Sequence, residues 1–155
     1  MSTVSRSTRI AAPAEEVWVM LSDLPSMGDR SPENVGGRWT GGATGPAVGA
    51  TFKGSNQRGW RRWSTVVEVV RSVPGSEFAF SVKVFGMRVA DWAYDVTPEG
   101  TDSCSVTETW TDRRGPLLLR VGPLLTGVAD REAFTASSIE TTLASLKTRA
   151  EAADR

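Results

Sequence analysis

The sequence predicts an α+β fold in which one curved antiparallel β-sheet wraps around a long C-terminal helix. Two observations indicate this class: residues 51–112 read as successive strands separated by short turns, and an apolar stripe at helical spacing runs from Leu125 to Ala150. The apolar face of such a sheet needs a cover, which the helix would supply. Since 155 residues is the size of one domain, we expect a single domain over residues 1–155.

The chain is expected to begin with a strand followed by a helix. Residues 3–11 alternate between two faces, as a half-buried strand does. The segment "APAEEVWVMLSDLP", residues 12–25, is typical of a helix, with Pro13 at its first position and acidic residues in its first turn, where the helix dipole favours anions. Pro25 is expected to end this helix.

The middle of the chain predicts about six antiparallel strands. The glycine-rich residues 36–49 are interpreted as turns around one short strand at 38–40, since they lack the spacing of a phosphate-binding loop. Turn signals such as Pro74-Gly75 and Pro98-Glu99-Gly100 separate the segments that follow. We expect further strands at residues 51–58, 62–72, 77–85, 88–97 and 103–112.

The C-terminal part is expected to be helical. Residues 117–125, "LLLRVGPLL", form an apolar piece that the Gly122-Pro123 pair is expected to break. Beyond the break, steps of four and three residues place one continuous stripe on a long amphipathic helix. The members of this stripe are Leu125, Ala129, Glu132, Ala136, Ile139, Leu143, Leu146 and Ala150.

Composition argues against several functions. The chain has 18 Lys+Arg and 18 Asp+Glu, so general attraction to nucleic acid or to anionic lipid is not expected. With 0 His there is no Ser-His-Asp triad and no histidine-bound zinc, and neither a metal nor a cofactor is expected. The single Cys104 cannot form an intrachain disulfide, and no apolar run has the length of a signal peptide or a bilayer span. We therefore expect a cytoplasmic protein without stable membrane insertion.

Alternation along the strands assigns inward-facing side chains, and one of them is a carboxylate. Glu108 falls between two apolar residues on the inward face, where a carboxylate is costly unless it is paired or hydrogen-bonded. Two interpretations stay open: an ion pair with an arginine such as Arg38, or a place in a cavity where Glu108 contacts a ligand. Glu132 and Tyr94 present the same choice between a structural role and a ligand contact.

The stretch "GWRRW", residues 59–63, has two readings as well. Two tryptophans around two arginines resemble a platform for nucleic-acid bases, but such a platform needs exposed aromatic residues on a basic surface. Alternation instead turns Trp63 toward the apolar core and leaves Trp60 in the preceding turn. We therefore expect no nucleic-acid partner.

Three segments of the chain carry a resemblance to known proteins, and they are "IAAPAEEVWVMLSDLPSM", "VGATFKGSNQRGWRRWSTVVEVVRSVPGSEFAFSV" and "CSVTETWTDRR". They resemble the START/Bet v 1-like (SRPBCC) superfamily, in particular its bacterial polyketide cyclase/dehydrase and lipid-transport-like proteins. The resemblance covers nearly the whole chain and implies a helix-grip fold with an apolar cavity between the sheet and the C-terminal helix. It supplies no catalytic motif, and a fold does not by itself imply a function.

The leading hypothesis is a non-catalytic binder or carrier of a small hydrophobic molecule, such as a lipid or a polyketide. Aromatic and aliphatic side chains would bind its apolar body, and Glu108 and Tyr94 would orient a polar end. Leu124, Val128 and the Gly122-Pro123 kink would form a gate. The candidate ligand-binding residues are Trp39, Trp63, Phe80, Val82, Trp92, Tyr94, Glu108, Trp110, Val128 and Glu132.

Two other hypotheses stay open. The first is a cyclase or dehydratase acting on a polyketide-like substrate, with Glu108 as the general base. The second is a toxin-like or regulatory protein-interaction module in which Trp60, Arg61 and Arg62 form an exposed anchor, since Trp and Arg dominate interface hot spots. A homodimer or another protein partner is compatible with either.

Overall fold

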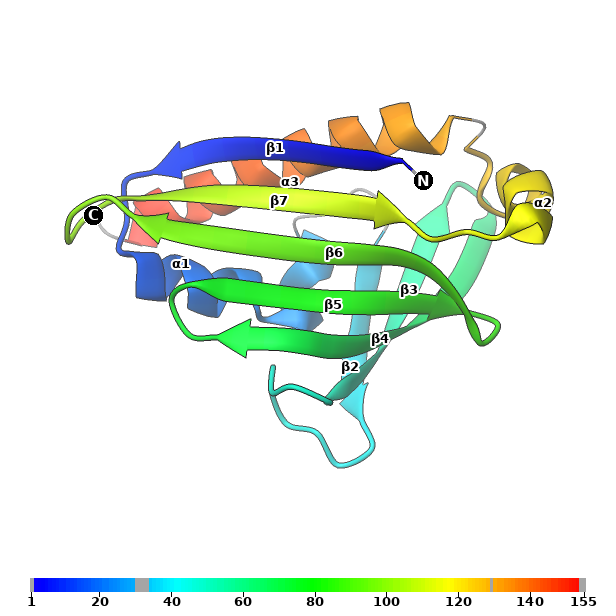
Figure 1. Cartoon of the computed structure of the whole chain (residues 1–155), viewed down its shortest axis with the longest axis horizontal. Helices are drawn as coiled ribbons and strands as arrows, with labels where there is room; N and C mark the ends of the chain where they lie inside the picture. Colours follow the sequence, from blue (N-terminus) through cyan, green and yellow to red (C-terminus); the bar gives the residue numbers. More distant parts are fainter. Residues whose placement is uncertain (1, 30–33, 129, 154–155) are drawn as a thin grey trace.

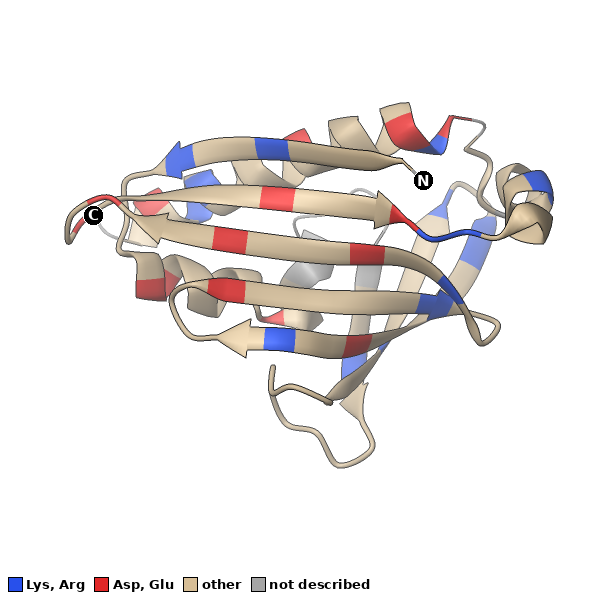
Figure 2. Ribbon diagram, viewed as in Figure 1, with Lys and Arg blue, Asp and Glu red and all other residues tan. Residues whose placement is uncertain are grey.

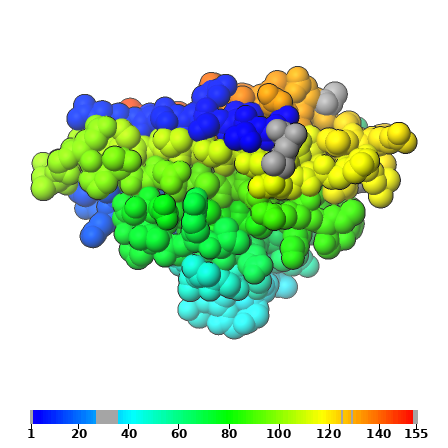
Figure 3. All heavy atoms as spheres, in the orientation of Figure 1, coloured from blue at the N-terminus to red at the C-terminus, as the bar shows by residue number. Residues whose placement is uncertain are grey.

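The computed structural model describes residues 2–29, 34–128 and 130–153. One antiparallel sheet curves around the C-terminal helix α3, Arg131–Ala153, and the expected α+β helix-grip architecture is confirmed (Figure 1). In the space-filling view the strands form a continuous surface on the side away from α3, while the loop around residues 41–50 and helix α2, Pro116–Thr126, project from it (Figure 3).

The sheet has seven strands in the order β1-β7-β6-β5-β4-β3-β2. The first two strands of the chain therefore lie at opposite edges of the sheet, joined by α1, Ala14–Leu21, and a 3-10 helix η1, Leu24–Asp29. The remaining strands follow one another as a meander, as the recurring turns predict. The strands are β1 Thr3–Ile10, β2 Asn34–Thr40, β3 Thr51–Arg58, β4 Arg61–Val73, β5 Glu77–Val84, β6 Met87–Pro98 and β7 Cys104–Asp112.

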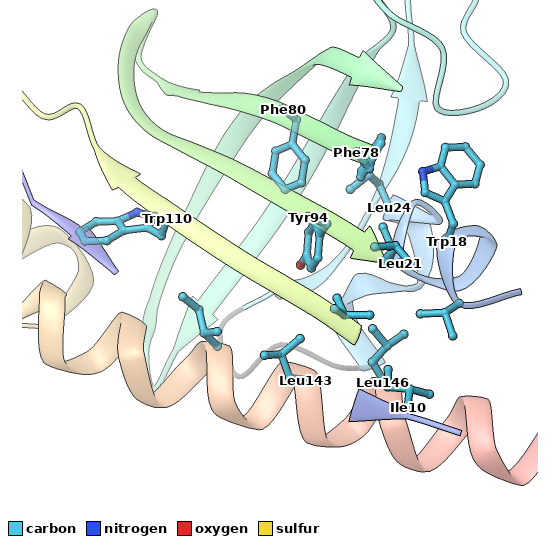
Figure 4. Packing of buried hydrophobic residues seen from close by; sticks show 14 of the residues in the cluster. Ile10, Trp18, Leu21, Leu24, Phe78, Phe80, Tyr94, Trp110, Leu143 and Leu146 are labelled. Atoms are coloured by element: carbon cyan, nitrogen blue, oxygen red, sulfur yellow. The ribbon is translucent and has the colours of Figure 1, made fainter. Parts of the chain in front are cut away.

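The core lies where α1 and α3 meet the inner face of the sheet. Ile139, Leu143 and Leu146 of α3 are buried there, as the helical stripe predicts (Figure 4). Trp18 of α1 packs edge-on against Phe78, with 6.3 Å between ring centroids. Its indole Nε1 donates a hydrogen bond to the carbonyl oxygen of Glu77 at 2.8 Å, so the polar end of this large side chain is satisfied inside the core.

The prediction that the Gly122-Pro123 pair breaks the helix is wrong. Helix α2 continues through both residues, because a proline removes one backbone donor and the rest of the ladder persists. Gly127 ends the helix instead: it adopts a left-handed φ of 75° and donates its N–H to the carbonyl of Pro123 at 2.8 Å. Of the predicted stripe, the side chain of Leu125 and all of Ala129 lie outside the described residues.

A new helix starts after this turn. The carboxylate of Asp130 accepts a hydrogen bond from the backbone N–H of Ala133 at 3.0 Å, which is the usual way an aspartate caps a helix N-terminus. Helix α3 runs from there along β1, and the elements with which it makes its main contacts are β1, α1 and β7. The inner face of β4 and β5 therefore has space in front of it.

Candidate functional site

A cavity of about 640 Å³ lies between the inner face of the sheet and helices α2 and α3. Its volume falls within the range of roughly 300–1,000 Å³ that small-molecule sites occupy. The strands contribute most of its wall, and the two helices close it from the other side. The lining residues on the strands and their turns include Asn56, Arg62, Trp63, Thr65, Val67, Phe80, Val82, Lys83, Phe85, Val89, Ala90, Trp92, Tyr94, Glu108 and Trp110.

Six aromatic side chains line the cavity. Phe80 on β5 is in register with Trp92 on β6, and Trp92 is in register with Trp110 on β7. Cross-strand partners point to the same face of a sheet, so these three rings form one row across the inner face (Phe80 and Trp110 are labelled in Figure 4). Trp63, at the start of β4, also lines the cavity, as its inward orientation predicts.

The cavity contains one buried polar pair. Tyr94 and Glu108 are cross-strand partners on β6 and β7, with exposed fractions of 3% and 1%. The hydroxyl of Tyr94 donates a hydrogen bond to Oε1 of Glu108 at 2.8 Å. The interpretation that Arg38 pairs with Glu108 is wrong, because Arg38 is exposed on β2 at the opposite edge of the sheet from β7 and β1.

Helix α3 turns a polar stripe toward the cavity. The lining residues Arg131, Thr135, Ser138 and Thr142 follow steps of four and three, so they share one helix face. The sequence prediction placed the inward stripe on the neighbouring residues and Arg131 on the outer face, and this placement of Arg131 is wrong because Arg131 lines the cavity. Glu132, the next residue along from Arg131, is exposed and is not among the lining residues.

Most of the predicted ligand-binding residues come together in the cavity. Trp63, Phe80, Val82, Trp92, Tyr94, Glu108 and Trp110 line it, although their role in binding remains a prediction. Trp39, Val128 and Glu132 do not line it. Trp39 packs on Phe52 near the sheet edge, with 5.4 Å between ring centroids, and Val128 is buried just after α2. The expected gate is also incomplete, since Leu124 points into solvent with an exposed fraction of 76%.

Ion pairs fix the chain where β7 passes into α2 beside the cavity. Arg114, a lining residue, donates from Nε and Nη2 to the carboxylate of Asp112 at 3.0 and 2.8 Å. Burial would raise the pKa of Asp112, but the hydrogen bonds and charge of Arg114 outweigh it and hold the pKa below its ordinary value. Asp91 is held in the same way by Arg88 and Arg113. Burial would raise its pKa, but its hydrogen bonds with these two arginines lower it below the ordinary value.

Asp112→Asn is expected to lower the free energy of unfolding by about 1–2 kcal/mol at pH 7, because Arg114 loses a charged acceptor. Because the pKa of Asp112 is lowered in the folded protein, its carboxylate stabilises the fold at pH values above its ordinary pKa of 3.8. This contribution is lost as the pH falls toward the pKa of the folded state. The difference in free energy of unfolding between the variant and the wild type should therefore become smaller in acid. Urea unfolding at neutral and acid pH measures it, with the exposed Asp95→Asn as the control. A difference that is independent of pH would contradict this assignment.

Together, the curved sheet, the long helix across it and the cavity between them define the helix-grip class of domains. The sequence profile described as "Polyketide cyclase / dehydrase and lipid transport" matches residues 1–151. The chain belongs to this family. No curated protein is detectably similar to the chain in sequence.

Solved structures with the same fold cover nearly all of the chain. A polyketide-cyclase-like protein of Corynebacterium glutamicum is 27% identical, covers 95% of this chain and 90% of its own, and has a TM-score of 0.60. A START superfamily protein of Mycobacterium smegmatis is 15% identical, with coverage of 96% and 97% and a TM-score of 0.67.

A third similar structure is the di-domain ARO/CYC StfQ from the steffimycin biosynthetic pathway. It is 14% identical, with a TM-score of 0.69, and the match covers 98% of this chain and 51% of that one. In the part of the chain that the structure describes, none of the helices combines the length and the apolar character needed to cross a bilayer.

Proposed function

We propose that the domain binds a small hydrophobic molecule, lipid-like or polyketide-like, in the cavity between the sheet and α3. The observation that carries this proposal is a cavity of about 640 Å³ with aromatic walls and one buried hydrogen-bonding pair inside it. Burying a ligand's apolar surface against such walls contributes about 25 cal/mol per Å². A fully packed core of this size would leave no such volume.

The polar groups of the cavity restrict the chemistry of the ligand and the orientation in which it binds. A hydroxyl of the ligand can donate a hydrogen bond to a carboxyl oxygen of Glu108. Cationic lining residues lie at the exposed ends of β4 and β5, where Arg62 and Lys83 are found. An amphipathic ligand with an acidic head would therefore place the head near these cations and its apolar body against Trp92 and Trp110.

Native mass spectrometry of the purified protein, followed by denaturing extraction, tests the proposal directly. A stoichiometric lipid or polyketide-like molecule on the protein is the expected result. An empty protein whose melting temperature is unchanged by a panel of fatty acids, phospholipids and aromatic polyketides would contradict it.

Trp92→Ala is expected to weaken binding of the identified ligand at least about tenfold, because it removes the middle ring of the aromatic row. Trp39→Ala is the matched control, since it removes the same side chain from outside the cavity and should leave the affinity unchanged. Titration calorimetry measures both variants. Equal losses in the two would show that the ligand does not occupy this cavity.

A second candidate function is a cyclase or dehydratase, favoured by the place of the Tyr94–Glu108 pair inside the cavity. Glu108 would act as the general base on a polyketide-like substrate, and Tyr94 would hold its carboxylate in position. The candidate predicts turnover whose pH dependence disappears in Glu108→Gln. Full turnover by Glu108→Gln would exclude Glu108 as the general base, and no turnover by the wild type on a panel of polyketide-like substrates would leave binding as the function.

A further inference from the structure

Large apolar side chains are exposed around one end of the domain. Trp60, Phe85, Leu117 and Leu124, called the rim here, have exposed fractions of 81%, 76%, 63% and 76%. They come from three separate segments: the turn between β3 and β4, the turn between β5 and β6, and helix α2. Figure 1 shows these segments at the same end of the molecule. The turn between β5 and β6 and helix α2 contribute residues to the cavity wall, and the turn between β3 and β4 lies next to the lining residue Arg62.

The backbone at Phe85 gives a second, independent reason to assign the rim a function. Phe85 has a left-handed φ of 52° and is the only non-glycine residue with positive φ among the described residues. It forms a two-residue turn with Gly86, a position at which Asn-Gly is strongly preferred and a bulky side chain is uncommon. Its ring is largely exposed, so the fold gains little from phenylalanine there, and such strain points to a role outside folding.

The same end of the domain is basic, although the formal net charge of the chain is +0. Residues 57–62, 83–88 and 113–128 contain no Asp or Glu, and they carry Arg58, Arg61, Arg62, Lys83, Arg88, Arg113, Arg114 and Arg120. Figure 2 shows acidic residues along the whole molecule, this end included. Asp91 pairs with Arg88 and Arg113, and Asp112 pairs with Arg114. The other cations give the three segments a positive charge, and they are Arg58, Arg61, Arg62, Lys83 and Arg120.

Contacts hold these cations next to the rim. The guanidinium of Arg61 lies over the ring of Trp60, 4.4 Å from its centroid, and its Nε donates to the carbonyl of Leu124 at 3.3 Å. The turn between β3 and β4 is thereby attached to α2. At this place a guanidinium group therefore lies directly beside two residues of the rim.

We propose that the rim docks the domain reversibly on an anionic lipid bilayer. Trp60, Phe85 and Leu124 would enter the interfacial layer, while Arg62 and Arg120 contact acidic head groups. Charge complementarity favours this occupant, since a bilayer offers negative charge to several cations at once, among them Arg62 and Arg120, and adapts to side chains that project from separate loops. The inference rests on the proposed function in one respect: a cavity that opens onto a bilayer can exchange an apolar ligand without passing it through water.

Sedimentation of the full chain with vesicles tests the docking surface without any cavity ligand. The protein should bind vesicles of equal parts phosphatidylcholine and phosphatidylglycerol and should not bind phosphatidylcholine alone. Binding should fall when the salt concentration rises from about 0.1 M to about 0.5 M, because the charges are exposed to solvent. Equal binding to the two vesicle types, or binding to neither, would overturn the proposal.

Variants localise the effect to the rim. Phe85→Asn should weaken vesicle binding about tenfold while leaving the melting temperature unchanged or raised, because asparagine suits the left-handed turn. Arg120→Gln should weaken it about fivefold at low salt. Val48→Asn, at a side chain that is 65% exposed in the loop before β3, is the matched control and should bind as the wild type does. Equal effects of Phe85→Asn and Val48→Asn would contradict the assignment.

The remaining outcomes separate this inference from the proposed function. Sedimentation velocity without vesicles should show a monomer; a dimer that Phe85→Asn dissociates would make a second copy the occupant of the rim and overturn the proposal. Native mass spectrometry of the same preparations reports cavity loading. A loaded cavity without vesicle binding would overturn only the docking surface, whereas vesicle binding by a protein that never takes up ligand would support docking and contradict the proposed function.

Discussion

Phe78→Ala is expected to lower the free energy of unfolding by about 3–5 kcal/mol, among the largest effects of any single truncation in this domain. Phe78 has an exposed fraction of 0%, and its ring contacts those of Trp18 and Phe80, with 6.3 and 5.7 Å between centroids. It joins α1 to the sheet at the end of the molecule away from the rim. Removing its ring leaves a void that the surrounding rigid strands cannot fill.

Urea denaturation measures this loss, and Phe78→Leu provides a graded control. Leucine keeps much of the apolar volume, so its cost should be clearly smaller than that of alanine. Because Phe78 does not line the cavity, ligand affinity should survive under conditions in which the alanine variant is still folded. A cost below about 1 kcal/mol for Phe78→Ala would show that this part of the core is loosely packed.

Tyr94→Phe is expected to lower the free energy of unfolding by about 1–3 kcal/mol, because the buried carboxyl of Glu108 loses its hydroxyl donor. The double variant Tyr94→Phe/Glu108→Leu should recover most of this loss. Replacing both members of a buried polar pair by apolar groups is nearly neutral or stabilising, whereas removing one member leaves the other buried without its partner. Chemical denaturation of the two single variants and the double variant completes a thermodynamic cycle.

The same variants separate stability from function. If the pair serves a ligand, the double variant should be about as stable as the wild type and yet should lose affinity for any ligand that carries a hydroxyl. A double variant that is less stable than Tyr94→Phe alone would indicate that Glu108 has a structural role, and the pair would then explain the fold and not the binding.

Alternation predicted the strands and their faces well. The buried residues of β7 are Cys104, Val106, Glu108 and Trp110, and the last three are those assigned to the inward face from sequence. Period-two alternation is set by the pleat itself, so it is visible in a single strand. Register is a property of two strands, and the contact between Tyr94 and Glu108 therefore could not be derived from the alternation of either strand.

The errors at the site have a related cause. Trp39 has the right residue type on a strand of the sheet, but its strand lies at an edge, and alternation reports a face without reporting the distance from the cavity. Thr135 and Thr142 were missed for the opposite reason: they are polar on a helix whose buried side was expected to be apolar. The helical stripe was predicted correctly where α3 covers the core and incorrectly where α3 borders the cavity.

The strand order also dictates when the domain can become complete as it is synthesised. Thr3 at the start of β1 pairs with Thr111 near the end of β7, so β1 waits during synthesis for the strand of this sheet that is made last. At about 5–20 residues per second, this delay is on the order of ten seconds. Throughout it the hydrogen-bonding edge of β1 is available to other chains, and contacts between such distant segments also slow folding. Within this domain the nascent chain is therefore most exposed to misassembly at β1, where Arg6 and Arg9 place charge on the edge strand.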